Sequence, residues 1–211
     1  MNDMESKEQR LTLELLDAIE RSGDVSQRHL ASQMGVALGL ANSYLKRCAK
    51  KGLVKIREAP ANRYFYYLTP QGFAEKSRLT AQFLSDSLTF YRQSAESLNE
   101  LFRDCQDKDW TRLVLCGVSD LTEIAMLRVD KTGLKIIAVY EPDDSAVDFL
   151  GRPIYQDWAA CPQADAYVIT DLQNPLKIFN DMVLKIGEKD RVLVPRVLGI
   201  DHSQLAGQPD T

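Results

Sequence analysis

The stretch from residue 70 to about residue 107 restricts the fold most, because no turn signal interrupts it. Pro70 suits a first helical position and Thr69 suits the cap before it. Apolar residues then recur at alternating spacings of three and four, which is the heptad pattern of a coiled coil. This seam consists of Ala81, Leu84, Leu88, Tyr91, Ala95, Leu98, Phe102 and Cys105. The pattern predicts a long coiled-coil-type helix that extends roughly 50 Å.

Such an apolar stripe needs a partner, and two are compatible with the sequence. One is the same helix of a second subunit, and the other is the C-terminal part of the chain folding back. We favour the first alternative and predict a homodimer.

Length and composition exclude several classes of protein. A chain of 211 residues suits two small domains. It contains no apolar run close to the roughly 20 residues that span a bilayer, and its N-terminus, MNDMESKEQR, is charged. We therefore expect a cytoplasmic protein without a membrane partner. Four dispersed cysteines and two histidines (Cys48, Cys105, Cys116, Cys161, His29 and His202) predict reduced thiols and no metal site.

The net charge of −4 hides a strong asymmetry along the chain. Residues 25–78 contain 10 Lys and Arg against 2 Asp and Glu, a net charge of +8. Residues 79–211 contain 13 basic against 21 acidic residues, a net charge of −8. One basic segment within an acidic protein indicates that a polyanion binds at that segment.

The basic segment has the pattern of a winged helix-turn-helix. Residues 5–22 have helical apolar spacing, Ser26 begins a second helix, and a turn at Gly35 separates it from a third. After Gly52, the runs LVKIREA and YFYYLTP flank PANR and predict a hairpin, or wing. In this hairpin, Lys55 and Arg57 are expected to point outward and Val54 and Ile56 inward.

The third helix, from about Leu38 to Lys51, is the predicted recognition helix for the DNA major groove. Asn and Ser near its start can reach base edges, and its Lys and Arg side chains suit phosphates. The candidate DNA-binding residues are Leu38, Gly39, Asn42, Ser43, Lys46, Arg47 and Lys50 on this helix, and Arg63 near the wing tip. The alternative is a polar three-helix module used for protein contacts.

These segments resemble the MarR-type regulators associated with exopolysaccharide (EPS) gene clusters. The resemblance covers roughly residues 10–95 and implies a winged helix that binds double-stranded DNA. The resemblance rests on two motifs. One is L-G-x-x-N-x-x-L-K in the recognition helix, and the other is L-T-P-x-G-x-x-E-K-x-R-L-T, where a strand leads into the next helix. The matching residues are Leu38, Gly39, Asn42, Leu45, Lys46, Leu68, Thr69, Pro70, Gly72, Glu75, Lys76, Arg78, Leu79 and Thr80. The wing tip, PANR, is shorter than the loop of that family.

From Trp110 onward, apolar strands alternate with helices, which predicts a parallel sheet with right-handed crossovers. We expect a Rossmann-like domain with a strand order near 3-2-1-4-5. Its first strand leads into VLCGVSDLTEIAM, where a nucleotide-binding fold would have G-x-G-x-x-G. Gly117 is present, but Ser119 and Thr122 replace the second and third glycines. A complete dinucleotide is therefore disfavoured, and a smaller ligand or a scaffold for protein contacts stays open.

This half resembles the nucleotide-binding domains of sugar-nucleotide dehydratases and sialic-acid-type acetyltransferases over about residues 110–198. The resemblance lies in Gly117, Ser119, Asp120 and Glu123, and then in Glu141 and Asp143. With Thr170 and Asp171 at the switch region of the sheet, the candidate ligand-binding residues are Gly117, Ser119, Asp120, Glu141, Thr170 and Asp171. The resemblance implies a nucleotide or nucleotide-sugar effector; we predict no bound cofactor.

The sequence as a whole predicts an α+β winged helix-turn-helix domain at 1–80, a long helix at 81–107, an α/β Rossmann-like domain at 108–200 and a flexible tail at 201–211. We expect a homodimeric, sequence-specific transcription regulator whose C-terminal domain senses an effector or binds a protein. Because no Y-x-x-x-K pair follows the glycine turn, we predict that the chain is not an enzyme. The competing functions are a protein-interaction adaptor with incidental DNA binding and a small nucleotide-sugar-modifying enzyme.

Overall fold

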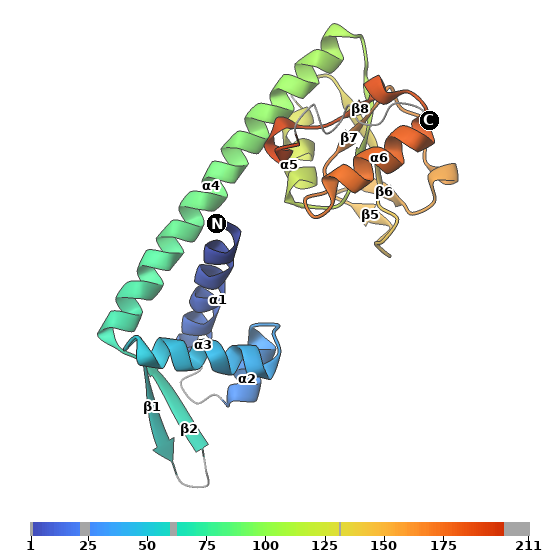
Figure 1. Cartoon of the computed structure of the whole chain (residues 1–211). Coiled ribbons are helices and arrows are strands. Elements are labelled where there is room, and N and C mark those ends of the chain that lie inside the picture. Colours follow the sequence, from blue (N-terminus) through green and yellow to red (C-terminus); the bar gives the residue numbers. More distant parts are fainter. Residues whose placement is uncertain (1, 22–25, 60–62, 131, 201–211) are drawn as a thin grey trace, which may run out of the picture. The chain divides into compact units, whose positions relative to one another are not determined.

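The computed structural model describes residues 2–21, 26–59, 63–130 and 132–200 (Figure 1). The wing tip at 60–62 and the predicted flexible tail at 201–211 lie outside the described residues. The chain divides into two compact units, unit 1 at Met1–Leu88 and unit 2 at Thr89–Thr211. Helix α4, Pro70–Asp107, crosses this division, as the absence of turn signals predicted. In the described part, no helix has both the length and the apolar character needed to cross a membrane.

Unit 1 is the predicted winged helix-turn-helix. Its elements are α1 (Asn2–Arg21), α2 (Gln27–Gln33), α3 (Leu38–Lys50), β1 (Val54–Ala59), β2 (Arg63–Leu68) and the first half of α4. Ser26 caps α2 because its side chain accepts a hydrogen bond from the His29 N–H. Leu15 and Leu16 of α1, Leu30 of α2 and Leu45 of α3 are fully buried together, so the three helices share one core.

The hairpin has a regular antiparallel register from Val54↔Leu68 to Ala59↔Arg63. Lys55 and Arg57 are exposed, as predicted. Ile56 lies on the same face of the hairpin as Tyr66, as predicted, but 47% of its surface is exposed. Ile56 pairs with Tyr66, and the larger Tyr66 side chain is the one that enters the core.

The junction between the hairpin and α4 is tightly bonded to the end of α3. The Thr69 hydroxyl donates to the Gly52 carbonyl at 2.7 Å and accepts from the Gly72 N–H at 3.0 Å. The Thr69 N–H donates to the Leu53 carbonyl at 3.0 Å. Lys76 then pairs with Asp17 and Glu20 of α1. The segment from Leu68 to Thr80 therefore fixes α4 to both α1 and the C-terminal end of α3.

Unit 2 contains a six-stranded sheet in the order β5-β6-β4-β3-β7-β8. Its elements are β3 (Arg112–Cys116), α5 (Asp120–Val129), β4 (Lys135–Tyr140), β5 (Asp148–Phe149), β6 (Arg152–Tyr155), β7 (Ala166–Ile169), α6 (Pro175–Ile186) and β8 (Val192–Leu193). The four pairings among β6, β4, β3, β7 and β8 are parallel. Numbered along the chain without β5, these strands have the predicted order 3-2-1-4-5. The sequence did not reveal β5, a two-residue strand that pairs antiparallel to β6.

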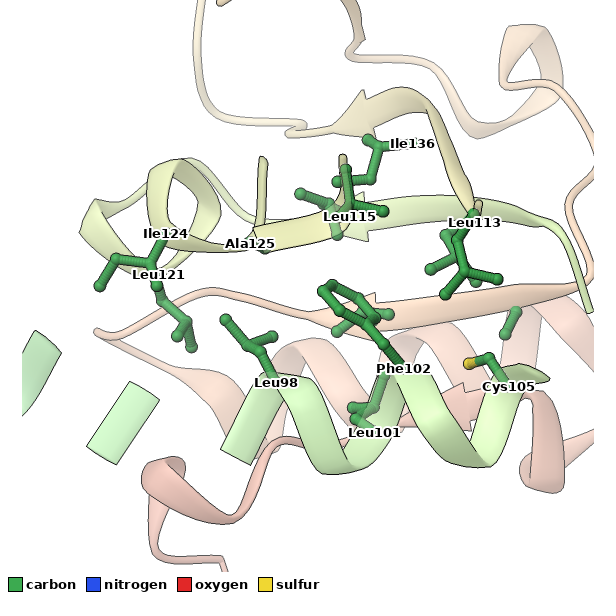
Figure 2. Packing of buried hydrophobic residues seen from close by; sticks show 14 of the residues in the cluster. Leu98, Leu101, Phe102, Cys105, Leu113, Leu115, Leu121, Ile124, Ala125 and Ile136 are labelled. Carbon is green, nitrogen blue, oxygen red and sulfur yellow. The ribbon is translucent and has the colours of Figure 1, made fainter. Parts of the chain in front are cut away.

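Helices cover both faces of this sheet, as the alternation along β3 requires. Leu113 and Leu115 point to the face covered by α5 and by the second half of α4 (Figure 2). Val114 and Cys116 point to the other face and pack with Phe179 and Met182 of α6. Unit 2 is therefore a three-layer α/β domain that includes part of the long helix.

The second half of the predicted heptad seam does not form a coiled coil. Ala95, Leu98, Phe102 and Cys105 are buried in unit 2, where Leu98, Phe102 and Cys105 lie against strand and α5 residues (Figure 2). The remaining seam residues, Ala81, Leu84, Leu88 and Tyr91, are exposed. Of the two alternatives for covering the seam, packing against the C-terminal part of the same chain is therefore the one found for its C-terminal half.

Asp165 connects the starts of two neighbouring strands. Its Oδ2 accepts from the Thr111 and Arg112 N–H groups, each at 2.8 Å. These backbone hydrogen bonds lower the pKa of the Asp165 carboxyl, since they stabilise its charged form. Asp165 therefore orients the segment that leads from α4 into β3.

Candidate functional site

One face of α3 presents half of the predicted DNA-binding residues. Gly39, Ser43, Lys46 and Lys50 are exposed and follow one another at helical steps of four, three and four. The opposite face, with Ala41, Leu45 and Cys48, is buried in the core. The helix thus offers a polar and basic stripe to the outside, and a β-carbon on Gly39 would meet no atom within 4 Å.

The other predicted contacts lie beside this stripe or outside it. Leu38 is exposed at the start of α3. Asn42 is half-buried, and its Oδ1 has no hydrogen-bond partner within the described part of the chain. Arg63 begins β2, and its side chain lies outside the described residues. On the wing, Lys55 and Arg57 add two exposed cations that the sequence placed correctly.

Arg47 is held by other residues of unit 1. Its Nη1 lies 2.8 Å from Glu8 Oε1, and its guanidinium carbon lies 4.2 Å from the centre of the Tyr44 ring. Glu8 belongs to α1 and is 39 residues away in sequence. The sequence analysis therefore placed Arg47 correctly on α3 but missed both of its neighbours. Only the acidic composition of α1 could have suggested an ion pair with this helix.

Cys48 has no free surface from which to react. It lies in the core of unit 1, and burial raises the pKa of its thiol. Burial likewise raises the pKa of Cys105 and of Cys161, each to about 11. Cys48 and Cys105 are buried and act as packing residues.

The second candidate site, the glycine turn, lies where β3 ends and α5 begins. Gly117 has φ +112°, and a β-carbon at this position would lie 2.4 Å from the Asp171 nitrogen. Glycine is thus required because the turn packs directly against the backbone that follows β7. Its carbonyl accepts hydrogen bonds from the hydroxyls of Thr122 and Thr170, at 2.7 and 2.8 Å.

The serine and threonine that replace the missing glycines close this turn from within. Ser119 caps α5 by accepting from the Leu121 N–H at 3.1 Å, and its hydroxyl donates to the Thr170 carbonyl at 2.5 Å. The Thr122 hydroxyl accepts from the Ser119 N–H at 3.0 Å. Ser119 and Thr122 form a reciprocal capping box. Ser119 and Thr122, which stand where the nucleotide-binding motif has glycines, therefore bind groups of the chain itself at the place where a ligand would bind.

The acidic candidates are also bonded internally, apart from Asp120, which is exposed at the start of α5. Glu141 Oε2 accepts from the Val118 N–H at 3.0 Å. Asp171 Oδ1 accepts from the N–H groups of Gln173 and Asn174.

The structure thus gathers all six predicted ligand residues at the carboxyl end of the sheet. A nucleotide at such a turn needs free N–H groups and a free carboxylate. Because Val118 and Glu141 already bind each other, a nucleotide at this turn would have to displace their hydrogen bond.

A cavity of about 620 Å³ lies elsewhere in unit 2. It is lined by the second half of α4, by Trp110 and by the segment from Lys189 to Arg196. The six residues of the glycine turn are not among its described lining residues.

The comparisons with known proteins give different results for the two units. Residues 9–63 match the model of the MarR family. Searching the curated proteins gives no match to the chain. A solved MarR family transcription regulator is 20% identical, with 46% of this chain and 73% of that chain covered and a TM-score of 0.33. The PcaV transcriptional regulator from Streptomyces coelicolor is 19% identical, with 46% and 70% covered and a TM-score of 0.37.

Methyltransferases are also among the matched structures. Human N-acetylserotonin methyltransferase in complex with SAM is 14% identical, with 90% of this chain and 75% of that chain covered and a TM-score of 0.36. This finding contradicts the prediction that the chain is not an enzyme, and we withdraw that prediction. A TM-score below 0.5 assigns no reaction, substrate or cofactor to this chain.

The N-terminal part of the chain is confirmed as a winged helix-turn-helix, with the recognition helix, core and hairpin in their predicted places. Its match to the family model lies within this unit. Residues 9–63 are therefore similar to the MarR family, and this similarity supports a DNA-binding transcription regulator.

Proposed function

We propose that the protein is a homodimeric transcription regulator that binds double-stranded DNA sequence-specifically through α3. The observation that carries this proposal is the exposed stripe of Gly39, Ser43, Lys46 and Lys50, in the unit that matches the MarR family model. Ser43 lies where a hydroxyl can reach a base edge, and the two lysines lie where they can meet phosphates. The wing residues Lys55 and Arg57 extend the same basic unit.

Removing Lys46 or Lys50 is expected to weaken DNA binding uniformly across sequences. Each lysine that neutralises one phosphate contributes about 0.9 to the slope of log K against log salt concentration. Gel-shift titrations with DNA from the gene neighbourhood of the protein, at several salt concentrations, measure this slope for Lys46→Ala and Lys50→Ala. Lys177→Ala, on α6 of unit 2, is the matched control and should bind like the wild type. Unchanged slopes for both α3 variants would refute the assignment of this helix to DNA.

We propose that the exposed first half of the seam on α4 pairs two subunits. Leu84 and Leu88 are 55% and 53% exposed, which is unusual for leucines in heptad register. Two paired subunits would present two recognition helices to a two-fold operator.

The double variant Leu84→Glu, Leu88→Glu is expected to be monomeric, because four buried carboxylates cannot share an apolar seam. Sedimentation velocity measures the mass of the particle. Gln93→Glu adds charge to the same helix away from the seam, so it should remain dimeric. A monomeric wild type at micromolar concentration would contradict the proposed pairing.

Unit 2 is proposed to sense an effector or to bind a protein, and α4 is proposed to carry the response. This helix is part of both cores, so a change in unit 2 reaches unit 1 through one continuous element. The internal hydrogen bonds of the glycine turn favour the protein-binding role. The resemblance to EPS-associated regulators suggests surface-polysaccharide genes as targets and nucleotide sugars as effectors. Thermal-shift measurements on the full chain with nucleotides and nucleotide sugars test the effector role, and unchanged melting would eliminate it for those compounds.

A further inference from the structure

The ion pair between Glu8 and Arg47 distinguishes Arg47 from the other cations of α3. The two side chains are 45% and 43% exposed and meet through one nitrogen–oxygen contact of 2.8 Å. Within the described residues, Lys46 and Lys50 have no carboxylate at ion-pairing distance. Arg47 is therefore the cation of this helix whose charge is compensated inside the protein.

Tyr44 restricts Arg47 further. The guanidinium lies 4.2 Å from the centre of the Tyr44 ring, and this ring is buried in the core of unit 1. A planar guanidinium that contacts a fixed ring loses freedom to swing toward solvent. Arg47 is thus held on the flank of α3 between the exposed stripe and α1, rather than extended from the stripe.

A carboxylate and a phosphate compete for the same donors of a guanidinium, because both accept its parallel N–H groups. A phosphate that approaches Arg47 must also approach the negative charge of Glu8. Since both partners are solvent-exposed, the pair is weak enough to be displaced. Glu8 is therefore placed to reduce the attraction of Arg47 for a DNA backbone without blocking it permanently.

We propose that Glu8 is a positioning residue that keeps Arg47 from binding the phosphates of arbitrary DNA and so lowers non-specific affinity. This inference rests on the proposed function and concerns the same surface. Its consequence is that non-specific binding depends on Lys46 and Lys50, while Arg47 contributes little as long as Glu8 is charged.

A double-mutant cycle on the full chain tests this inference. Glu8→Gln, Arg47→Ala and the double variant are titrated with a duplex of scrambled sequence between about 50 and 200 mM salt, the range over which phosphate contacts change affinity strongly. Glu8→Gln is expected to bind several-fold more tightly than the wild type and to steepen the salt slope by about 0.9, the contribution of one phosphate contact. Arg47→Ala alone should leave the salt slope unchanged because no phosphate contact is lost, but it should weaken binding because the Glu8 carboxylate is then uncompensated. In the Glu8→Gln background, Arg47→Ala should abolish the gain.

Glu14→Gln is the matched control, because it removes the same charge from the same helix. Glu14 pairs with Arg10 on α1 at 3.1 Å instead of with a residue of α3. If Glu14→Gln tightens binding as much as Glu8→Gln, the effect is the net charge of α1 and the inference is wrong. Circular dichroism and thermal unfolding of each variant verify that the fold is unchanged.

The remaining outcomes separate the inference from the proposed function. Wild-type binding that Glu8→Gln leaves unchanged or weakens overturns the inference alone. Absence of binding by the wild type and by Glu8→Gln, even at low salt, overturns the proposed function and the inference with it. A gain that persists in the double variant shows that Glu8 acts without Arg47, which also overturns the inference.

Discussion

Gly117→Ala is expected to destabilise unit 2 by about 3 kcal/mol or more, the sum of backbone strain and overpacking. The φ of Gly117 is +112°, a conformation that L side chains rarely adopt. The added β-carbon would also lie 2.4 Å from the nitrogen and 2.6 Å from the Cα of Asp171. Both are backbone atoms next to β7, so the clash cannot be relieved by rotating a side chain.

Chemical denaturation followed by tryptophan fluorescence measures this effect. Trp110 and Trp158 are the two tryptophans of the chain, and both belong to unit 2. Gly133→Ala is the control, since Gly133 has φ +76° but a β-carbon added to it would meet no described atom within 4 Å. It should lose about 1 kcal/mol from the positive φ alone. Equal losses for the two variants would show that the contact with Asp171 does not restrict the turn.

Gly72→Ala is expected to destabilise unit 1 by about 2–3 kcal/mol, an overpacking effect. Gly72 lies in the first turn of α4, where a β-carbon would be 2.1 Å from the Leu53 carbonyl oxygen. That oxygen also accepts a hydrogen bond from the Thr69 N–H at 3.0 Å. Making room for the methyl group would break this junction. Because Leu53 directly follows the end of α3, we also expect weaker DNA binding.

Gly39→Ala is the matched control for Gly72→Ala, because both glycines lie near the start of a helix and Gly39 has no neighbour within 4 Å of its β-carbon position. It should be as stable as the wild type or up to about 1 kcal/mol more stable, since alanine favours helices. Circular dichroism, which reports on both units, is compared with the fluorescence transition of unit 2. Full stability of Gly72→Ala would contradict the close packing of α4 on Leu53.

The sequence predicted the local elements well, because short-range physical rules determine them. Periodic apolar residues defined α1 to α3 and the strands of unit 2, and the cap Ser26 fixed where α2 begins. The order of the parallel strands followed from the alternation of strands and helices, since crossovers are short and right-handed. Long-range information was not needed for these features.

The residues of the sites were predicted from the period of one helix and from the rule that parallel strands end at one edge of the sheet, but their long-range contacts were not. The stripe on α3 needed the period of one helix, and it was found. The ion pair of Arg47 joins residues 39 positions apart, and the Thr170 hydroxyl reaches a carbonyl 53 positions away. No local pattern encodes such contacts, because they depend on how separate elements pack.

The long helix α4 shows the same difference between what the sequence predicts and what only the tertiary structure decides. The sequence by itself determined that α4 is helical from Pro70 to Asp107 and that one stripe of it is apolar. A heptad pattern indicates that an apolar stripe is buried, but it does not indicate which surface buries it. Only the tertiary structure decided this for the second half, where the core of unit 2 covers Leu98 and Phe102 completely. Leu84 and Leu88, in unit 1, are exposed. The reason is that burial of apolar surface is non-directional. The surface that covers the stripe of α4 is therefore determined by the fold of the whole domain.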